Sequence, residues 1–171
     1  MTVDAEGNAY VTDSLSPVIY KVALDGTAEV FASDTRFGFL NGIVYHPNGY
    51  LLVGANDDNA LLKVTLQDPA EITEVDIRRP LRSDGMTLTN DLELLMVIQP
   101  PLGNLLKLSS EDDWASARVL ERASAIMRSF PTDVALRDGQ TYVSHANFGA
   151  IRQQEVPLAF EILRPHFEVN E

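Results

Sequence analysis

The stretch NGIVYHPNGYLLVGANDDNALLKVTL (residues 41–66) decides the fold, because other parts of the chain follow the same pattern. Two such parts are DGMTLTNDLELLMVIQPPLGNLLKLS (residues 84–109) and MTVDAEGNAYVTDSLSPVIYKVAL (residues 1–24). Superposing the three stretches aligns one lysine from each, namely Lys21, Lys63 and Lys107. A turn position is aligned as well, and with a weaker fourth copy (residues 131–148) it is occupied by Gly7, Gly49, Leu92 and Gly139.

A repeat of about 40 to 50 residues with several short strands is typical of a β-propeller. In the second copy we expect four strands, at residues 42–46, 51–55, 61–66 and 72–77. Turn sequences such as HPNG and NDDN lie between them. The strands are rich in β-branched and aromatic residues, which favours an all-β array of four-stranded antiparallel blades.

The repeats divide the chain at about residues 1–34, 35–79, 80–124 and 125–171. The first copy lacks counterparts of Asn41 and Gly42, so Met1 falls inside a strand of the repeat. We therefore expect an incomplete propeller, with about four of six blades, and a longer parent protein. An open arc leaves apolar blade faces uncovered, which predicts self-association or a protein partner that completes the ring.

The composition excludes several classes of function. The 171 residues carry a net charge of −12, which repels phosphate backbones and argues against a nucleic-acid partner. There is no cysteine, so disulfides, thiolate catalysis and cysteine-bound metals are excluded. No apolar run reaches the roughly 20 residues that a membrane helix needs.

Two segments could depart from the repeat. Residues 110–128 contain many helix formers, but residues 117–120 occupy the column of the outer strand, which favours a strand between long loops. We expect Trp114 to pack between blades and a closing strand at residues 160–163.

Two of the repeated stretches carry a family resemblance. SDGMTLTNDLELLMV (residues 83–97) and LNGIVYHPNGYLLVGAN (residues 40–56) resemble the inner strands of the SMP-30/gluconolactonase family, whose regucalcin-like members are propellers. The resemblance implies that the parent is a metal-dependent lactonase or related ester hydrolase acting on a small-molecule substrate. In that family a divalent cation, commonly Ca²⁺, lies at the mouth of the central channel.

By their motifs, Asn41 and Asp84 match two ligands of that cation, and Asp84 also matches the general base. The residue types agree, because amide and carboxylate oxygens are ligands that Ca²⁺ and Mg²⁺ prefer. Both residues occupy one column of adjacent repeats, so we expect their side chains to converge on one cavity. The family's glutamate ligand has no counterpart in this chain, and we therefore expect the chain alone to be inactive.

Other interpretations stay open. Asn-Gly and Asp-Gly pairs commonly cap turns, so Asn41 and Asp84 could be structural. The chain could then be a non-catalytic propeller scaffold or a subunit of a larger assembly. Sequence alone does not choose among these alternatives.

The remaining polar candidates are weaker. His145 follows the second strand of the fourth copy and is a candidate substrate-binding residue, whereas His46 is expected to be exposed and His166 lies in the C-terminal tail. The acidic pairs in NDDN (residues 56–59) and at residues 112–113 are interpreted as a turn and a solvated loop.

Overall fold

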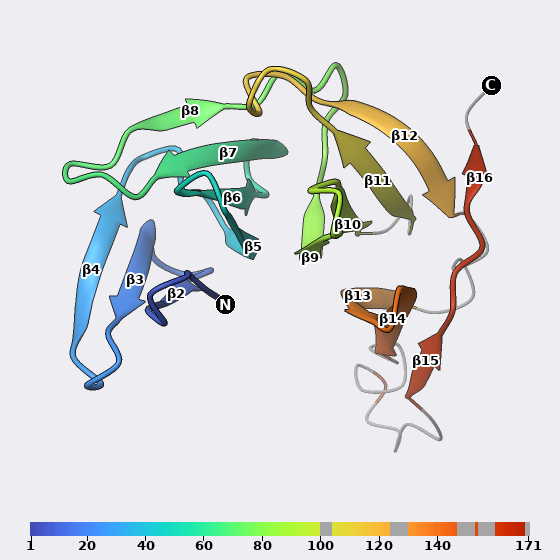
Figure 1. The fold of residues 1–171 in the computed structure, drawn as a ribbon, viewed down its shortest axis with the longest axis horizontal. Helices are drawn as coiled ribbons and strands as arrows, with labels where there is room; N and C mark the ends of the chain where they lie inside the picture. The colour runs from blue at the N-terminus through green and yellow to red at the C-terminus, as the bar shows by residue number, and fades with distance from the viewer. Residues whose placement is uncertain (100–103, 124–129, 147–152, 154–159, 170–171) are drawn as a thin grey trace. The chain divides into compact units, whose positions relative to one another are not determined.

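A computed structural model describes residues 1–99, 104–123, 130–146, 153 and 160–169. Strands account for the regular structure of this part of the chain, which contains no helix. The strands form four antiparallel sheets (Figure 1). The chain separates into two compact units, one of Met1–Ser83 with Ser110–Arg118 and one of Asp84–Ser109 with Val119–Glu171. We call them unit 1 and unit 2.

Unit 1 contains two four-stranded sheets in which neighbours in sequence are neighbours in space. The first sheet consists of β1 (Thr2–Val3), β2 (Ala9–Thr12), β3 (Val18–Val22) and β4 (Ala28–Ser33). The second consists of β5 (Leu40–His46), β6 (Tyr50–Ala55), β7 (Ala60–Thr65) and β8 (Ile72–Glu74). One apolar cluster joins both sheets, and its fully buried members include Ile19, Leu40, Leu51 and Val64.

Unit 2 contains the other two sheets. The third sheet is formed by β9 (Ser83–Leu88), β10 (Leu94–Ile98), β11 (Leu105–Ser109), β12 (Arg118–Ala123) and, paired to β12, β16 (Glu168–Val169). The fourth sheet is formed by β13 (Phe130–Arg137), β14 (Gln140–Ala146) and β15 (Glu161–Leu163). Its core joins Leu95, Val97 and Leu105 of the third sheet to Val134 and Val143 of the fourth.

This architecture confirms the predicted all-β fold of repeated antiparallel sheets. The strands expected at residues 42–46, 51–55 and 61–66 correspond to β5, β6 and β7. The expected outer strand is β12 and the expected closing strand is β15. The pairing of β16 with β12 was not predicted, and residues 124–129 lie outside the described part of the chain.

The aligned turn position has the same backbone conformation in every copy. The φ angles are +89° at Gly7, +88° at Gly49 and +71° at Gly139. Leu92 takes the same position with φ +60°, although a residue with a side chain rarely adopts that region. The repeat geometry therefore persists where the glycine does not.

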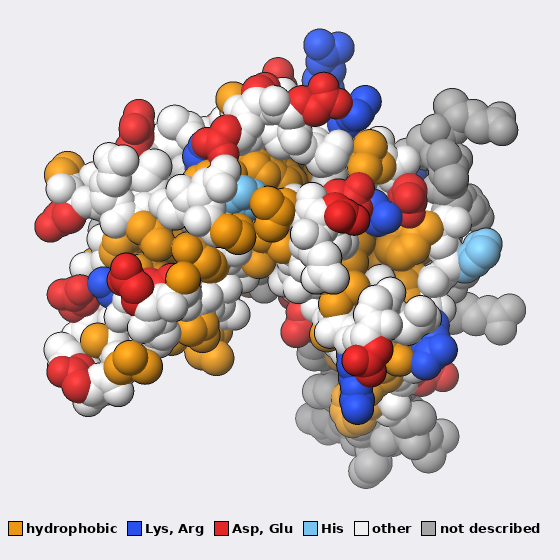
Figure 2. Space-filling view, in the orientation of Figure 1, with side chains coloured by type: hydrophobic (Ala, Val, Ile, Leu, Met, Phe, Trp, Pro, Cys, Tyr) orange, Lys and Arg blue, Asp and Glu red, His pale blue; other side chains and the backbone are white. Residues whose placement is uncertain are grey.

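The three aligned lysines also have equivalent partners in the neighbouring strands. Lys21, Lys63 and Lys107 lie in the third strands and pair across to Tyr10, Leu52 and Leu95 of the second strands. On the face shown in Figure 2, Asp and Glu side chains are scattered over both units rather than gathered in one place. No helix in the described ranges is long and apolar enough to span a membrane.

Candidate functional site

Asn41 lies at an irregularity near the start of β5. Leu40 pairs with Ala55 and Ile43 pairs with Val53, so two residues of β5, Asn41 and Gly42, face a single residue of β6. Such a bulge redirects side chains and is common next to active sites. Asn41 is half-buried.

The backbone around Asn41 is held by the preceding sheet. Thr12 Oγ1 donates to the Asn41 carbonyl over 2.8 Å, and Ser14 Oγ donates to the Leu40 carbonyl over 2.7 Å. Both donors lie at or just after the end of β2. Each neutral hydrogen bond of this kind contributes about 1 kcal/mol, so the start of β5 is fixed without use of the Asn41 side chain.

The start of β9 is held in an equivalent way. Asn56 Nδ2 donates to the carbonyl of Ser83 over 2.8 Å, and Ser83 Oγ lies 3.5 Å from Asn56 Oδ1. Asn56 and Ser83 are both buried, at 3% and 1% exposure. Asn56 occupies the same position of the repeat as Ser14, and Ser83 occupies the same position as Leu40. We call this recurring hydrogen bond, from Ser14 to Leu40 and from Asn56 to Ser83, the clasp.

The clasp was not predicted from the sequence, although the sequence contains a signal for it. Ser14 and Asn56 are polar residues in one column, each shortly after an apolar second strand. In both cases the accepted carbonyl belongs to the residue directly before a candidate ligand, Asn41 or Asp84. The two candidate ligands therefore follow backbone that is positioned in the same manner.

Asp84 itself is half-buried in β9 and is contacted by Gln99, whose Nε2 lies 3.5 Å from Asp84 Oδ2. The next residue, Gly85, packs directly against Asp133 of β13, and a Cβ there would lie 2.6 Å from the Asp133 Cα. The site within unit 2 thus includes a second carboxylate that was not predicted. The pairing of β13 with β14 is irregular between Pro131 and Asp133. This irregularity lies at the same position of the repeat as the one in β5.

Asn41 belongs to unit 1 and Asp84 to unit 2. Their convergence on one cavity therefore stays a prediction. Across the described ranges, no group of three or more His, Asp or Glu side chains is placed to hold a metal ion. Asn41 and Asp84 have the hard oxygen atoms that Ca²⁺ prefers, but they supply only part of the six to eight ligands that it takes.

His145 is 3% exposed in β14, where it pairs with Pro131 on one side and Glu161 on the other. Burial lowers the pKa of its imidazole, while the charge of Glu161 acts in the opposite direction. A neutral, buried imidazole is the expected state at neutral pH. Its role in substrate binding stays a prediction.

The expectation that His46 is exposed was wrong. His46 is 3% exposed, and its ring stacks on Tyr50 with centroids 4.4 Å apart. Its Nδ1 accepts a hydrogen bond from the Asn48 backbone N–H over 3.2 Å. This hydrogen bond ties the turn after β5 to the imidazole, and burial lowers the pKa of His46. The third histidine, His166, is exposed.

The interpretation of residues 112–113 as a solvated loop was also incomplete. Asp113 Oδ1 accepts from Asn48 Nδ2 over 3.0 Å and from the Tyr50 hydroxyl over 2.9 Å. Lys63 Nζ lies 2.6 Å from both Asp113 Oδ2 and the Asp113 carbonyl. These partners, first of all Lys63, lower the pKa of Asp113 to about 2. The loop is therefore an anchor on the second sheet, and its Trp114 is buried at 3% exposure.

No protein-family model matches this chain, and no curated protein sequence is similar to it. Solved structures do match. The major allergen Mala s 1 of Malassezia sympodialis superposes with a TM-score of 0.75 at 23% identity, over 98% of this chain and 54% of that one. A catalytically inactive virginiamycin B lyase from Staphylococcus aureus with quinupristin gives 0.65 at 18% identity, over 85% and 46%.

A luciferin-regenerating enzyme gives a TM-score of 0.66 at 15% identity, over 85% of this chain and 52% of that one. This chain thus spans about half the length of the structures that it matches. At these identities the similarity concerns the fold. The chain has the fold of β-propeller blades.

Proposed function

We propose that this chain is part of an SMP-30/gluconolactonase-like propeller whose whole protein is a metal-dependent lactonase or related ester hydrolase. The observation that supports it is the clasp. It holds the backbone before Asn41 and before Asp84 in the same way, although the residues that form it differ. Equivalent positioning of an amide and a carboxylate in adjacent repeats is what a shared ligand set requires.

In this proposal the Asn41 amide oxygen and the Asp84 carboxylate bind a divalent cation, with Ca²⁺ as the favoured ion. A bound cation of this kind polarises a carbonyl and lowers the pKa of a coordinated water. Asp84 accepts a proton from the water that attacks the lactone carbonyl carbon and returns it to the ring oxygen as the ring C–O bond breaks, so that a hydroxy acid is released. Gln99 holds the Asp84 carboxylate in place through its amide.

Two ligands leave most of the coordination shell of Ca²⁺ to other groups. We therefore expect the chain alone to bind Ca²⁺ weakly and to show no turnover, with further ligands supplied by the rest of the protein. The virginiamycin B lyase and the luciferin-regenerating enzyme support a catalytic use of such a fold. The lactonase assignment rests on the motifs around Asn41 and Asp84.

A non-catalytic scaffold is the second candidate, and the edge strand β15 favours it. The fourth sheet has three described strands, and β15 lies at its edge. Ile162 within β15 is 73% exposed, and Phe160 just before the strand is 64% exposed. An exposed apolar edge strand is a template for pairing with another chain, as a subunit of a larger assembly would use it.

Calorimetric titration of the chain with CaCl₂ tests the site. We expect a dissociation constant of about 1 mM or weaker, and loss of that binding in both Asp84→Asn and Asn41→Ala. Asp25→Asn, an exposed turn aspartate in the first sheet, is the matched control and should bind as the unchanged chain does. Equal binding by Asp84→Asn and the control would exclude Asp84 as a ligand.

Hydrolysis of a δ-lactone, followed by acid release, tests the activity. We expect none from the chain alone, and turnover once it is joined to an N-terminal segment that supplies a further Glu and Asn ligand. Asp84→Ala should abolish that gain. Robust turnover by the chain alone would contradict this assignment, whereas no turnover in the joined form would favour the scaffold.

A further inference from the structure

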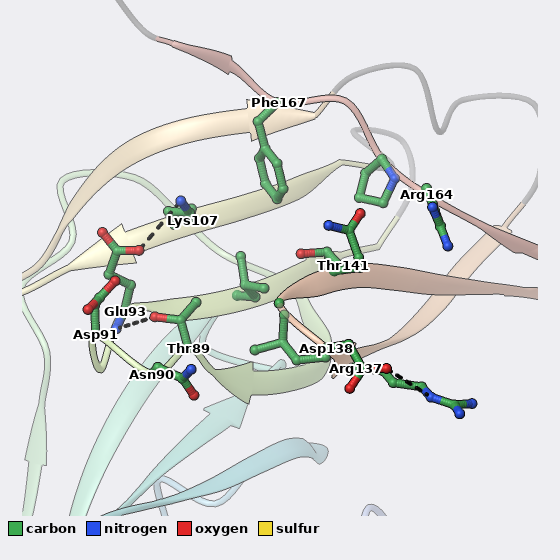
Figure 3. A pocket seen from close by; sticks show the side chains of 15 residues that line it. Thr89, Asn90, Asp91, Glu93, Lys107, Arg137, Asp138, Thr141, Arg164 and Phe167 are labelled. Carbon is green, nitrogen blue, oxygen red and sulfur yellow. Dashed lines mark hydrogen bonds and ion pairs between the residues drawn. The ribbon is translucent and has the colours of Figure 1, made fainter.

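Unit 2 has a cavity of about 650 Å³ that is separate from the proposed metal site (Figure 3). It lies at the turns that join β9 to β10 and β13 to β14, next to the segment before β16. Asp84 is near the beginning of β9, whereas the cavity begins beyond the end of that strand, at Thr89. Its volume is within the range of pockets that hold small molecules.

The middle of the cavity is apolar. Leu95 and Leu136 line it together with Phe167, whose ring projects into the cavity in Figure 3. Leu136 and Phe167 pack on the buried core of unit 2, and Leu95 is part of that core. An apolar ligand group that covers this surface is removed from water together with it, which favours binding.

One end of the cavity is acidic. Asp91 and Glu93 lie together on one side in Figure 3. Lys107 is close to them, but its Nζ lies 3.4 Å from Glu93 and 3.2 Å from Glu121, which together offset its charge. Asp91 is exposed and lies in the β9–β10 turn, so this end retains a net negative charge.

The other end is basic. Arg164 and Arg137 lie across the cavity from Asp91 and Glu93 in Figure 3. Arg164 Nη2 donates to the Tyr142 hydroxyl over 2.8 Å, and its guanidinium lies 5.1 Å from the Tyr142 ring centroid, which orients the side chain. Within the described residues no carboxylate forms an ion pair with Arg164. Arg137 is 3.6 Å from Asp138, and both side chains are more than 80% exposed, so that pair is weak.

We propose that this cavity binds a small amphipathic zwitterion of the amino-acid or dipeptide class. The ligand carboxylate pairs with Arg164, whose fork geometry suits two parallel hydrogen bonds. The ligand ammonium lies near Asp91 and Glu93, and an apolar side chain covers Leu136 and Phe167. A simple anion is disfavoured, because one end is acidic and the chain carries a net charge of −12.

The probe is the dipeptide leucyl-leucine, used free, N-acetylated or as the C-terminal amide, with binding to the whole chain measured by calorimetry. We expect the free dipeptide to bind about tenfold more tightly than either capped form, since each cap removes one charged end of the ligand and with it a charge-assisted hydrogen bond. Equal affinity for all three forms, or no binding of the free form, would overturn the proposal.

Two variants assign the ends of the ligand. Arg164→Gln should weaken the free and acetylated forms about tenfold and leave the amide unchanged. Asp91→Asn should weaken the free and amidated forms and leave the acetylated one unchanged. Arg82→Gln, an exposed arginine of unit 1, and Asp25→Asn are matched controls. If the controls weaken binding as much as the pocket variants do, the binding is a general charge effect and the proposed site is excluded.

Discussion

In the sheet β5–β8, the polar residue after the second strand, Asn56, donates forward to the carbonyl of Ser83. In the sheet that β9 opens, the repeat-equivalent Gln99 instead contacts the Asp84 side chain of its own sheet. The same position of the repeat therefore has two roles. In one sheet its side chain donates a hydrogen bond to the backbone of Ser83, and in the other it supports a candidate catalytic carboxylate.

The same two sheets also differ where the geometry is retained. Gly49 and Leu92 have φ angles of +88° and +60° at the same turn position. The turn conformation is set by strand register and not by the local preference of the residue. Comparing the two sheets thus separates positions where the repeat fixes the backbone from positions where the side chain decides.

The largest effect is expected from filling the glycine contacts. Gly85→Ala should lower the free energy of unfolding by about 3 kcal/mol, because the new Cβ meets the Asp133 backbone. Gly54→Ala in β6 meets the Ser83 hydroxyl, with the Ser83 Cβ at 3.0 Å. Urea denaturation of each variant gives the values.

Second-site changes sharpen this test. Ser83→Ala should partly restore Gly54→Ala, since it removes the nearest atom of the clash. Asp133→Ala should not restore Gly85→Ala, because the Asp133 Cα stays 2.6 Å from the new methyl group. Full recovery in the second pair would show that the contact is through side chains and not through backbone.

The next largest effect on stability is expected from removing the clasp. Asn56→Ala should cost about 2 kcal/mol, since it leaves the buried Ser83 carbonyl without its donor. Gln99→Ala removes a longer contact that is only partly buried and should cost less than half as much. Thermal unfolding of both variants measures the two losses of stability. Equal losses would mean that Asn56 and Gln99 contribute equally to the stability of the fold.

The parts of the fold that repeat were the most predictable from the sequence. The strand order and the aligned turn at Gly7, Gly49 and Gly139 were predictable, because hydrophobic alternation and turn residues are local signals. The burial of His46 was not, since its ring stacks on Tyr50, which is itself hydrogen-bonded to Asp113, 63 residues further along the chain. Asp133 was missed for a similar reason, because its contact with Gly85 joins two sheets and has no local signature.

A smaller effect is expected at the turn itself. Leu92→Gly should raise the free energy of unfolding by about 1 kcal/mol, because it relieves a side chain held at φ +60°. Gly49→Ala should have the opposite sign at the equivalent position. Urea denaturation of both variants decides, and a loss of stability in Leu92→Gly would show that the Leu92 side chain has a packing role that outweighs the strain.

The smallest effect concerns pH. Partners of Asp113 hold its pKa at about 2 in the folded chain, below the ordinary value of about 3.9. This ionised group therefore contributes stability above about pH 5, and the contribution is lost as the pH falls toward 2. Because the Asp113 side chain is 54% exposed, solvent screens the pairing, and we expect about 0.5 kcal/mol.

Asp113→Asn should flatten that part of the stability profile measured between pH 2 and pH 6. Lys63→Met should flatten it as well, because Lys63 is the main partner. In the double variant the two changes should not add. An unchanged slope in both single variants would show that the ion pair does not contribute to acid sensitivity.

The clasp has a consequence for how such a protein changes over evolutionary time. Its acceptors are main-chain carbonyls, those of Leu40 and Ser83, which every amino acid possesses. This hydrogen bond therefore does not depend on the side chains of the residues that follow, Asn41 and Asp84. A lineage could exchange those two side chains, and with them the chemistry, while the structural joint is inherited intact.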